Sequence, residues 1–393
     1  MSWHRVELGD VSRSVQTGPF GSQLHQSDYS EDGIPVVMPK DLVDGHISEA
    51  SIARVSSEHV ERLSRHKIEK GDILYSRRGD VGRCAFASEK EVGWLCGTGC
   101  LRVSVNPVVA NSKYVFYQLQ KPETVGWVIN HAVGATMLNL NTSILSAIPL
   151  NLPSIENQNR TVDILSSYDE LIENNQHQIR LLEEATQRLY KEWFVDLHFP
   201  GHEHVKIVDG LPEGWKKERL VDIANVQYGF AFDGSLFNSE RKGMPILRIR
   251  NIPAGLTDDF TTEEAEPQYV VHNGDIVVGM DGEFHINSWC GDDAYLVQRT
   301  CCIKPKKKEL HGWLLTAIVE PIKYFEKTVV GATVAHLGKK HIDTITLLTG
   351  TEDLYAPFQS IFDKRQLLLN QNRKLTEARD RLLPKLMSGE IEV

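Results

Sequence analysis

The feature that most constrains this chain is an internal repeat that covers almost its whole length. Val15-Gln16-Thr17-Gly18 matches Val226-Gln227-Tyr228-Gly229, and further landmarks recur in the same order in both halves. Because the period is about half of the 393 residues, the repeat predicts a duplicated domain and not a solenoid. The other paired landmarks are Gly33-Ile34-Pro35 with Gly243-Met244-Pro245, Lys70-Gly-Asp-Ile73 with Asn273-Gly-Asp-Ile276, and Val133-Gly-Ala-Thr136 with Val330-Gly-Ala-Thr333.

Each half predicts a mixed α+β domain followed by a long helix. Short apolar runs bounded by Gly, Pro and Asp are typical of strands. We expect domain 1 at residues 1–153, helix 1 at 154–197, domain 2 at 198–350 with a leading linker at 198–213, and helix 2 with a tail at 351–393. The predicted strands are Ile34–Met38, Ile73–Tyr75, Leu101–Val105, Ile246–Ile249, Ile276–Val278 and Tyr295–Val297, and the predicted helical pieces are Ser112–Gln120 and Gly312–Phe325.

The long segment after each domain has heptad spacing of apolar residues. The segments run from about Ile155 to Phe194 and from about Asp353 to Leu383. About 40 residues at 1.5 Å each make the first helix roughly 60 Å long. One predicted seam is Ile164, Tyr168, Leu171, Asn175, Gln178, Leu182, Ala185 and Leu189; the other is Leu354, Phe358, Ile361, Arg365, Leu368, Asn372, Leu375, Arg379, Leu382 and Leu386.

The connectivity predicts an antiparallel helix pair. Only about 20 residues join helix 1 to Trp215 of domain 2, so helix 2 has to run back to pack along helix 1. We therefore expect one domain at each end of the pair and a pseudo-two-fold axis between them. Asn175 and Asn372 differ by the same 197 residues as the Val-Gly-Ala-Thr motifs. Polar seam residues fix register, so we expect these two side chains to meet; the alternative is that both face solvent.

The composition excludes some classes of protein. The formal net charge is −10, but residues 1–150 hold 15 Lys+Arg against 16 Asp+Glu, so any nucleic-acid surface must be local. The absence of a membrane-length apolar run and of an apolar leader predicts a cytoplasmic protein. Six cysteines lack metal-site spacing, which predicts reduced, buried thiols and no metal site.

No familiar catalytic signature is present. The sequence lacks Pro-Pro, GxxxxGK[ST], GxSxG and HExxH, so it predicts neither an adenine methyltransferase of the Asn/Asp-Pro-Pro-aromatic type nor a P-loop ATPase. Two similar domains on a rigid spacer instead suit a protein that reads two separated half-sites on duplex DNA. The alternative is a scaffold in which the helices form a coiled coil and both domains bind protein.

With these landmarks in place, the chain resembles the specificity (S) subunits of type I restriction–modification systems over nearly its whole length. The resemblance rests on the Gly18–Ser22 loop, the Gly-Ile-Pro and Gly-Asp-Ile strands, the Gly-Ala-Thr turn and the Asn-containing helices. It implies a non-catalytic subunit that reads an asymmetric bipartite target in double-stranded DNA. It also implies docking of two methyltransferase subunits and of translocase–nuclease subunits. S-adenosylmethionine, ATP and Mg²⁺ would be cofactors of those partners and not of this chain.

Candidate DNA contacts are basic and polar residues near the strand ends, because forked donors read base edges and phosphates. Arg248 and Arg250 alternate on a predicted strand, which would place them on one strand face. For every arginine the alternative is a surface ion pair. For the glycine-rich loops at Gly18–Ser22 and Gly229–Ser235 it is a tight turn. The candidates are Ser22, Lys40, Arg77, Arg78, Arg83, Ser235, Arg248, Arg250, Asn251 and Arg299.

Overall fold

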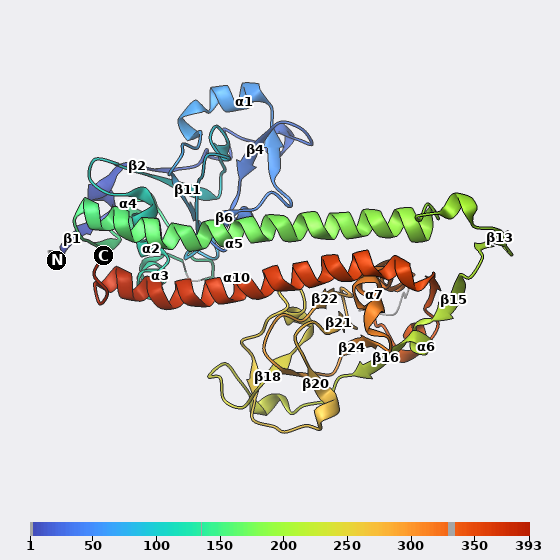
Figure 1. Ribbon diagram of the computed structural model, residues 1–393. Helices are drawn as coiled ribbons and strands as arrows, with labels where there is room; N and C mark the ends of the chain where they lie inside the picture. Colours follow the sequence, from blue (N-terminus) through green and yellow to red (C-terminus); the bar gives the residue numbers. More distant parts are fainter. Residues whose placement is uncertain (1–2, 135, 329–334) are drawn as a thin grey trace. The chain divides into compact units, whose positions relative to one another are not determined.

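The computed structural model describes residues 3–134, 136–328 and 335–393, and it divides into two compact units. Unit 1 is Met1–Asp169 with Ala378–Val393, and unit 2 is Glu170–Glu377. Each unit holds one α+β domain together with part of each long helix, α5 (Ile155–Tyr190) and α10 (Ala356–Ser388) (Figure 1). The predicted α+β fold with two long helices is confirmed. The second Val-Gly-Ala-Thr motif and Ala135 of the first lie outside the described residues.

Domain 1 contains two four-stranded sheets and a short strand pair. One sheet has the order β2-β11-β8-β9, and all of its neighbours are antiparallel. The other has the order β10-β4-β7-β3, in which β10 and β4 run parallel. The strands are β1 His4–Glu7, β2 Ser12–Thr17, β3 Tyr29–Ser30, β4 Ile34–Val37, β7 Ala53–Val55, β8 Ile73–Ser76, β9 Cys84–Phe86, β10 Leu95–Cys96, β11 Cys100–Val105 and β12 Pro149–Leu152, with a small hairpin of β5 Leu42–Val43 and β6 His46–Ile47.

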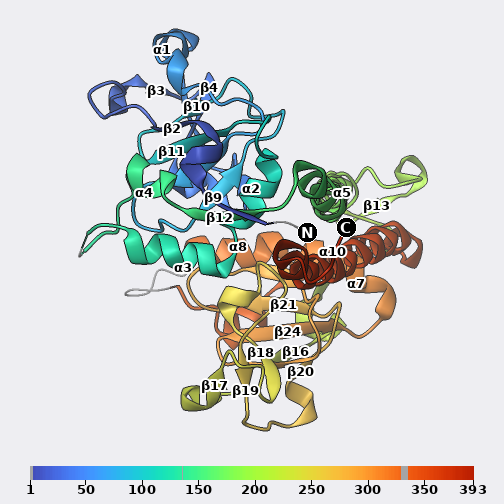
Figure 2. The same cartoon turned by 90° about the vertical axis from the view of Figure 1, so that its left-hand side faces the viewer.

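Domain 2 repeats the two larger sheets and the strand pair of domain 1, with β20 added at one sheet edge, whereas the β5–β6 hairpin has no counterpart among the described strands of domain 2 (Figure 2). The sheet β16-β24-β21-β22 corresponds to β2-β11-β8-β9, and β18 pairs with β23 in parallel as β4 does with β10. The strands are β15 Lys216–Arg219, β16 Ala224–Tyr228, β17 Phe237–Asn238, β18 Met244–Leu247, β19 Phe260–Thr261, β20 Val270–Val271, β21 Ile276–Gly279, β22 Ile286–Ser288, β23 Ala294–Leu296, β24 Thr300–Pro305 and β25 Thr346–Thr349; β13 Ile207–Val208 and β14 Leu211–Pro212 form a hairpin in the linker.

The central strands are apolar on both faces because each face belongs to a different core. In β8, Ile73 and Tyr75 enter the larger core of domain 1, whereas Leu74 enters a smaller core on the opposite face. Alternation of side chains along a strand produces this division. In domain 2 it also explains the cysteine doublet: Cys301 faces the larger core and Cys302 the smaller one.

A helical pair covers one side of each domain. In domain 1, α2 (Ser112–Leu119) ends before α3 (Pro122–His131). The helical piece predicted over Gly312–Phe325 is present but divided in two, because α7 (His311–Ala317) ends before α8 (Val319–Thr328). Pro321 lacks an N–H and its ring would clash with the carbonyl four residues back, so one continuous helix is disfavoured. The remaining short helices are α1 Ser57–Arg62, α4 Thr142–Ser146, α6 Leu220–Ile223 and α9 Lys339–Ile342.

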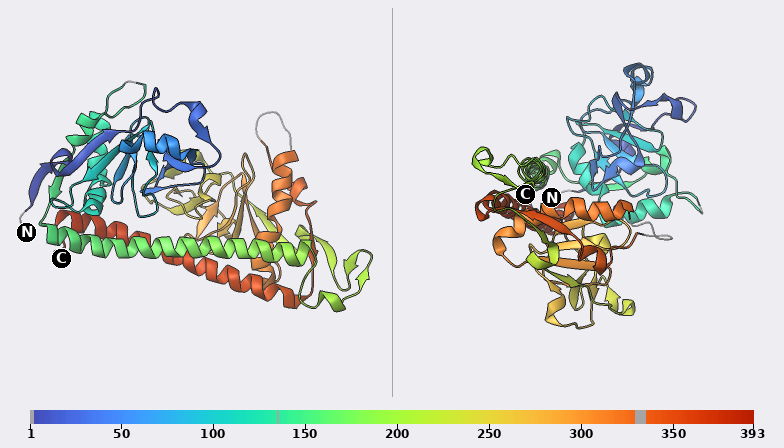
Figure 3. Two further views of the ribbon diagram at one scale, coloured as in Figure 1. Left: turned by 90° about the horizontal axis from the view of Figure 1, so that it is seen from above. Right: turned by 90° about the vertical axis from the view of Figure 1, so that its right-hand side faces the viewer.

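The two long helices run antiparallel within unit 2. Asn175 contacts Asn372, and eight residues further along α5 Glu183 contacts Arg365 of α10. The predicted seam of α5 is wrong at alternate positions: Leu171 is 51% exposed, whereas Ile172 is 9% exposed. Figure 3 shows both helices along their length. Neither they nor any other helix in the described part of the chain could span a membrane.

Candidate nucleic-acid interface

The end of the Gly-Asp-Ile strand forms the same corner in both domains. In domain 1 the Arg77 amide donates to the Gly99 carbonyl at 2.9 Å, and the Arg77 carbonyl accepts from Leu140 at 2.8 Å. In domain 2 Met280 makes the equivalent bonds to Arg299 and Leu337, at 2.9 and 2.8 Å. The backbone therefore confirms that Ser76–Gly79 aligns with Gly279–Gly282. We call these two regions corner 1 (residues 76–83 with 138–140) and corner 2 (residues 279–285 with 335–337).

Corner 1 presents two arginines that the described residues leave without an ion pair. Arg78 is exposed, and no described side chain forms a hydrogen bond or ion pair with its guanidinium group. Arg77 is half-buried, and its buried Nε has no hydrogen-bond partner among the described residues. These two guanidinium groups are therefore available to a ligand.

Two other arginine candidates already have carboxylate partners. Arg83 Nη2 lies 2.9 Å from Asp80 Oδ2 in corner 1. Arg299 Nη1 lies 2.8 Å from Asp281 Oδ2 in corner 2. Both pairs are partly exposed, so they could exchange partners, but neither guanidinium group is free in this structure. For these residues the ion-pair alternative describes the observed state.

The predicted pairing of Arg248 and Arg250 on one strand face is wrong. Strand β18 ends at Leu247, and Ile249–Asn251 form a 3₁₀ turn. The turn is stabilised because the Asn251 Oδ1 accepts from the Arg248 amide at 2.9 Å. Domain 1 has the same turn at Pro39–Asp41, where Asp41 accepts from the Met38 amide at 2.8 Å. Asn251 is thus used structurally through its carbonyl oxygen.

The side chains on these turns differ in availability. Lys40 donates to the Ser51 carbonyl at 2.6 Å, and Arg250 forms a two-pronged ion pair with Asp259. Arg248 has no carboxylate partner among the described residues; its guanidinium carbon lies 5.5 Å above the Phe237 ring. A cation over an aromatic face keeps its N–H groups at the ring edge free to donate. Arg248 is therefore the available donor of domain 2.

The glycine-rich loops are explained by close packing of the backbone. A Cβ on Gly18 would lie 1.8 Å from the Gly97 carbonyl oxygen, and one on Gly229 would lie 2.0 Å from that of Val297. Only glycine fits such an approach, but no glycine of these loops has a positive φ, so the alternative of a tight turn that requires one is wrong. Ser235 donates to Asp233 within its own turn, at 2.8 Å. Ser22 is exposed and has no described partner.

The helix pair contains a buried amide contact. The Asn175 Nδ2 donates to the Asn372 Oδ1 at 2.9 Å, and the Asn372 Nδ2 donates to the Ile172 carbonyl at 3.2 Å. Asn175 is 7% exposed, so the solvent-facing alternative does not hold for it. That this contact sets the register of the helices stays a prediction.

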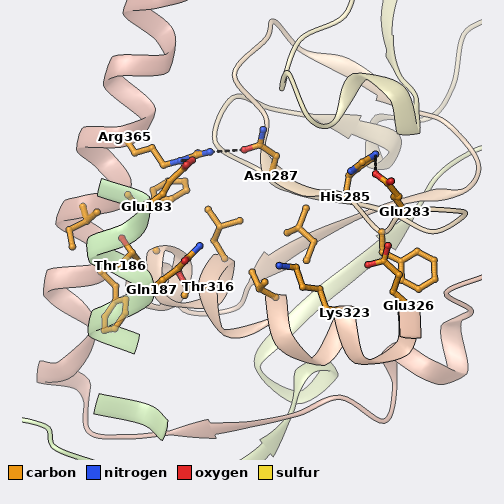
Figure 4. Close-up of a pocket in the computed structure, with 18 residues that line it drawn as sticks. Glu183, Thr186, Gln187, Glu283, His285, Asn287, Thr316, Lys323, Glu326 and Arg365 are labelled. Carbon is orange, nitrogen blue, oxygen red and sulfur yellow. Dashed lines mark hydrogen bonds and ion pairs between the residues drawn. The ribbon is translucent and has the colours of Figure 1, made fainter. Parts of the chain in front are cut away.

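Each domain is fastened to its own helix segments by charged hydrogen bonds. In unit 2, Arg365 Nε contacts Glu183 Oε1 at 2.7 Å, and its Nη2 donates to Asn287 Oδ1 at 2.8 Å (Figure 4). In unit 1, Asp169 accepts from Tyr117 at 2.5 Å and from Arg379 at 3.0 Å. Arg365 also lines a cavity of about 460 Å³ between the helix segments and domain 2. Sequence reasoning missed these contacts, because Arg365 and Arg379 looked like interruptions of an apolar seam.

The cysteine thiols are shielded from solvent. All six thiols are buried. Burial raises the pKa of Cys84, Cys96 and Cys301 to about 12, so these thiols stay protonated. No group of His, Cys, Asp or Glu among the described residues is placed to hold a metal ion.

Comparisons with known proteins agree with the duplicated fold. The family model described as "Type I restriction modification DNA specificity domain" matches residues 2–184 and 212–349. The type I restriction enzyme MjaIX specificity subunit of Methanocaldococcus jannaschii is 25% identical over 100% of this chain and 94% of its own length. The HindI specificity subunit of Haemophilus influenzae is 23% identical over 99% of both chains. The crystal structure of a type I restriction–modification S subunit from M. genitalium is 17% identical, covers 98% of this chain and 96% of its own, and has a TM-score of 0.61.

Proposed function

Because this chain belongs to the type I restriction modification DNA specificity domain family, we propose that it recognises an asymmetric bipartite DNA target with an undefined spacer. The observation that carries this proposal is a duplicated scaffold whose equivalent corners carry different side chains. Corner 1 carries Arg77 and Arg78, whereas corner 2 carries Met280, which is buried in the core, and Asp281, which is partly exposed. One domain would read each block, and since their reading groups differ, the two blocks would differ in sequence.

The available donors are the contacts that we assign to DNA. Arg77 and Arg78 serve block 1, the half-site read by domain 1, and Arg248 serves block 2, the half-site read by domain 2. A guanidinium fork suits the paired acceptors of guanine in the major groove and also suits phosphate oxygens. Ser22, Lys40, Arg83, Ser235, Arg250, Asn251 and Arg299 form a second group, whose polar atoms are exposed or committed to neighbours and would position the backbone of the DNA.

The helices would serve as spacer and docking site. Charged hydrogen bonds fasten each domain to its own helix segments, through Asp169 in unit 1 and Arg365 in unit 2. A domain held in this way cannot rotate freely on its helices, as a spacer requires. Two equivalent surfaces would seat two methyltransferase subunits, and translocase–nuclease subunits would join through them. S-adenosylmethionine, ATP and Mg²⁺ would act in those partners, and this chain would catalyse no reaction itself.

Selection of random duplex DNA by the chain assembled with its methyltransferase partner tests the proposal. We expect enrichment of two short defined blocks around an undefined spacer. Enrichment of a single block, or none with partner bound, would contradict the proposal and favour the scaffold alternative. Insertion of one heptad at matched positions of α5 and α10 should lengthen the spacer, and an unchanged spacer would disprove the role of the helices in setting it.

A further inference from the structure

We propose that the two domains read opposite hydrogen-bonding patterns at one equivalent position. Arg78 would donate to guanine in block 1, whereas Asp281 would accept from an exocyclic amino group, the N4 of cytosine or the N6 of adenine, in block 2. This inference rests on the proposed DNA recognition and assigns the base chemistry that each corner can read.

The backbone places Arg78 and Asp281 at the same point of their domains. Arg78 forms an isolated antiparallel bridge with Asn139, and Asp281 forms the same bridge with His336. The glycine that follows is fixed in both corners: Gly79 donates to Leu138 at 3.0 Å, and Gly282 donates to Ala335 at 3.1 Å. A donor in one domain therefore stands where the other domain has an acceptor.

Asp281 is held by two neighbours. Arg299 Nη1 lies 2.8 Å from its Oδ2, and His336 Nδ1 lies 2.5 Å from its Oδ1. A carboxylate has about four acceptor sites, so each oxygen keeps one for a ligand. The Asp281 side chain is 24% exposed and can therefore be reached. A carboxylate fixed from both sides can meet an amino group without losing further conformational freedom.

The backbone of Arg299 gives a second indication. Its φ is +69°, a left-handed conformation that is unfavourable for a residue with a Cβ. The equivalent residue in corner 1 is Gly99, whose carbonyl accepts from Arg77 as that of Arg299 accepts from Met280. Gly99 has no positive φ, so the left-handed conformation is particular to Arg299, whose side chain contacts Asp281. Strain of this kind is concentrated at functional sites.

Corner 1 offers a hydrogen-bond donor where corner 2 offers an acceptor. Arg78 is exposed and has no described side-chain partner, while the nearby carboxylate of Asp80 is occupied by Arg83 at 2.9 Å. The Arg78 guanidinium group can donate two parallel hydrogen bonds to guanine N7 and O6. The amino groups of cytosine and adenine cannot accept these bonds. In the major groove guanine offers two adjacent acceptors and no donor, so corner 1 can read it there with both prongs of the fork and corner 2 cannot.

The experiment uses the chain assembled with its methyltransferase partner on the duplex found by selection. Single bases are replaced by analogues: 7-deazaguanine in block 1, and in block 2 a pyrimidin-2-one in place of cytosine or an unsubstituted purine in place of adenine. We expect each contact to be worth about tenfold to a hundredfold in affinity. Which block 2 analogue weakens binding distinguishes cytosine from adenine.

Two variants assign the effect to the residues. Asp281→Ala should weaken binding to block 2 by the same factor. In this variant the analogue that lacks the amino group should cause no further loss of affinity. Arg78→Ala should behave in the same way with 7-deazaguanine in block 1. Matched controls are Glu283→Ala, which removes an exposed carboxylate of the same turn, and Lys90→Ala in domain 1; neither should change base preference.

The outcomes separate this inference from the proposed function. If the unmodified complex selects no bipartite motif, the proposed function fails. If it selects one but tolerates removal of every amino group in block 2, or of every guanine N7 in block 1, only the donor–acceptor assignment is overturned, and Asp281 is then a structural ion-pair partner. The measurements that combine the unsubstituted chain with the base analogues test the assignment even if Asp281→Ala unfolds corner 2.

Discussion

Corners 1 and 2 share a backbone but differ in chemistry. Both follow a Gly-Asp-Ile strand and make the same main-chain bonds, yet one ends in Arg77-Arg78 and the other in Met280-Asp281. The backbone bonds fix the fold and do not involve the side chains. A duplicated domain can therefore keep its stability while its ligand contacts diverge, so the two half-sites need not be alike.

The contacts that fasten the domains differ in a similar way. Unit 1 uses an acceptor on α5, because Asp169 binds Tyr117 and Arg379. Unit 2 uses a donor on α10, because Arg365 binds Glu183, and its Nη1 donates to Ser288 Oγ at 2.7 Å. Each arrangement satisfies a charge at a partly buried position. The side chain that joins the domain to its helix segments is therefore a carboxylate acceptor in unit 1 and a guanidinium donor in unit 2.

The largest effect should come from removing both free arginines of corner 1. Arg77→Ala with Arg78→Ala should weaken binding to block 1 by about 2–6 kcal/mol, since each bidentate base contact is worth about 1–3 kcal/mol. Binding to block 2 should not change. Titration of the assembled complex with duplexes carrying one intact block measures both effects. Equal losses at both blocks would show that these residues make no block-specific contact.

The next largest effect should come from removing Arg365, which joins domain 2 to its helix segments. Its side chain is 11% exposed, and that of Glu183 is 41% exposed. Arg365→Ala should lower the free energy of unfolding of unit 2 by about 2–3 kcal/mol, less than for a fully buried pair because Glu183 can be hydrated. Urea unfolding measures the loss. Arg188→Ala, which removes an exposed pair on α5, is the control and should change the stability little.

A smaller effect is expected at the 3₁₀ turn after β18. Arg248→Ala should weaken binding to block 2 alone by about 1–3 kcal/mol, because one forked donor is lost. The equivalent residue of domain 1 is Met38, which has no donor, and Met38→Leu should leave both blocks unaffected. A salt titration separates the possible roles. If Arg248 contacts only phosphate, the slope of log affinity against log salt should fall by about 1 and base preference should stay the same.

The smallest effect concerns a buried histidine in each unit. Burial lowers the pKa of His66 in unit 1 and of His311 in unit 2. The unfolded chain then binds more protons than the folded chain below the ordinary histidine pKa of about 6.5, so stability should fall as pH drops through this range. His311→Gln should reduce this pH dependence by about 0.5 kcal/mol between about pH 7 and pH 5.5. Thermal unfolding of the unsubstituted chain and of the variant at both pH values measures the difference.

Much of the fold could be predicted because it depends on local pattern and on repetition. The alternation of apolar residues identified strands such as β8 and β21, and the matching motifs aligned Ser76–Gly79 with Gly279–Gly282, as the backbone bonds confirm. The seam of α5 was predicted incorrectly at Leu171. Helices that pack against both a partner helix and a domain bury more than one stripe, so heptad counting alone cannot fix the phase.

The candidate site depended on long-range contacts that a sequence does not reveal. Arg250 looked equivalent to Arg248 until folding placed Asp259 beside it, and Arg299 likewise acquired Asp281 as a partner. Asp281 itself was overlooked because an acidic residue in a DNA-binding protein suggests solvent exposure. The motifs already aligned it with Arg78, but only the contacts with Arg299 and His336 in the folded chain mark it as a candidate reader.

The sequence by itself therefore determined the duplication, the α+β class of each domain, the two long helices and the family resemblance. Repeats and periodicities are properties of neighbouring residues, and they survive without knowledge of the fold. The tertiary structure alone decided which cations remain free and which are paired. Ion pairing depends on distances of a few ångströms between residues far apart in the chain, and those distances exist only after folding.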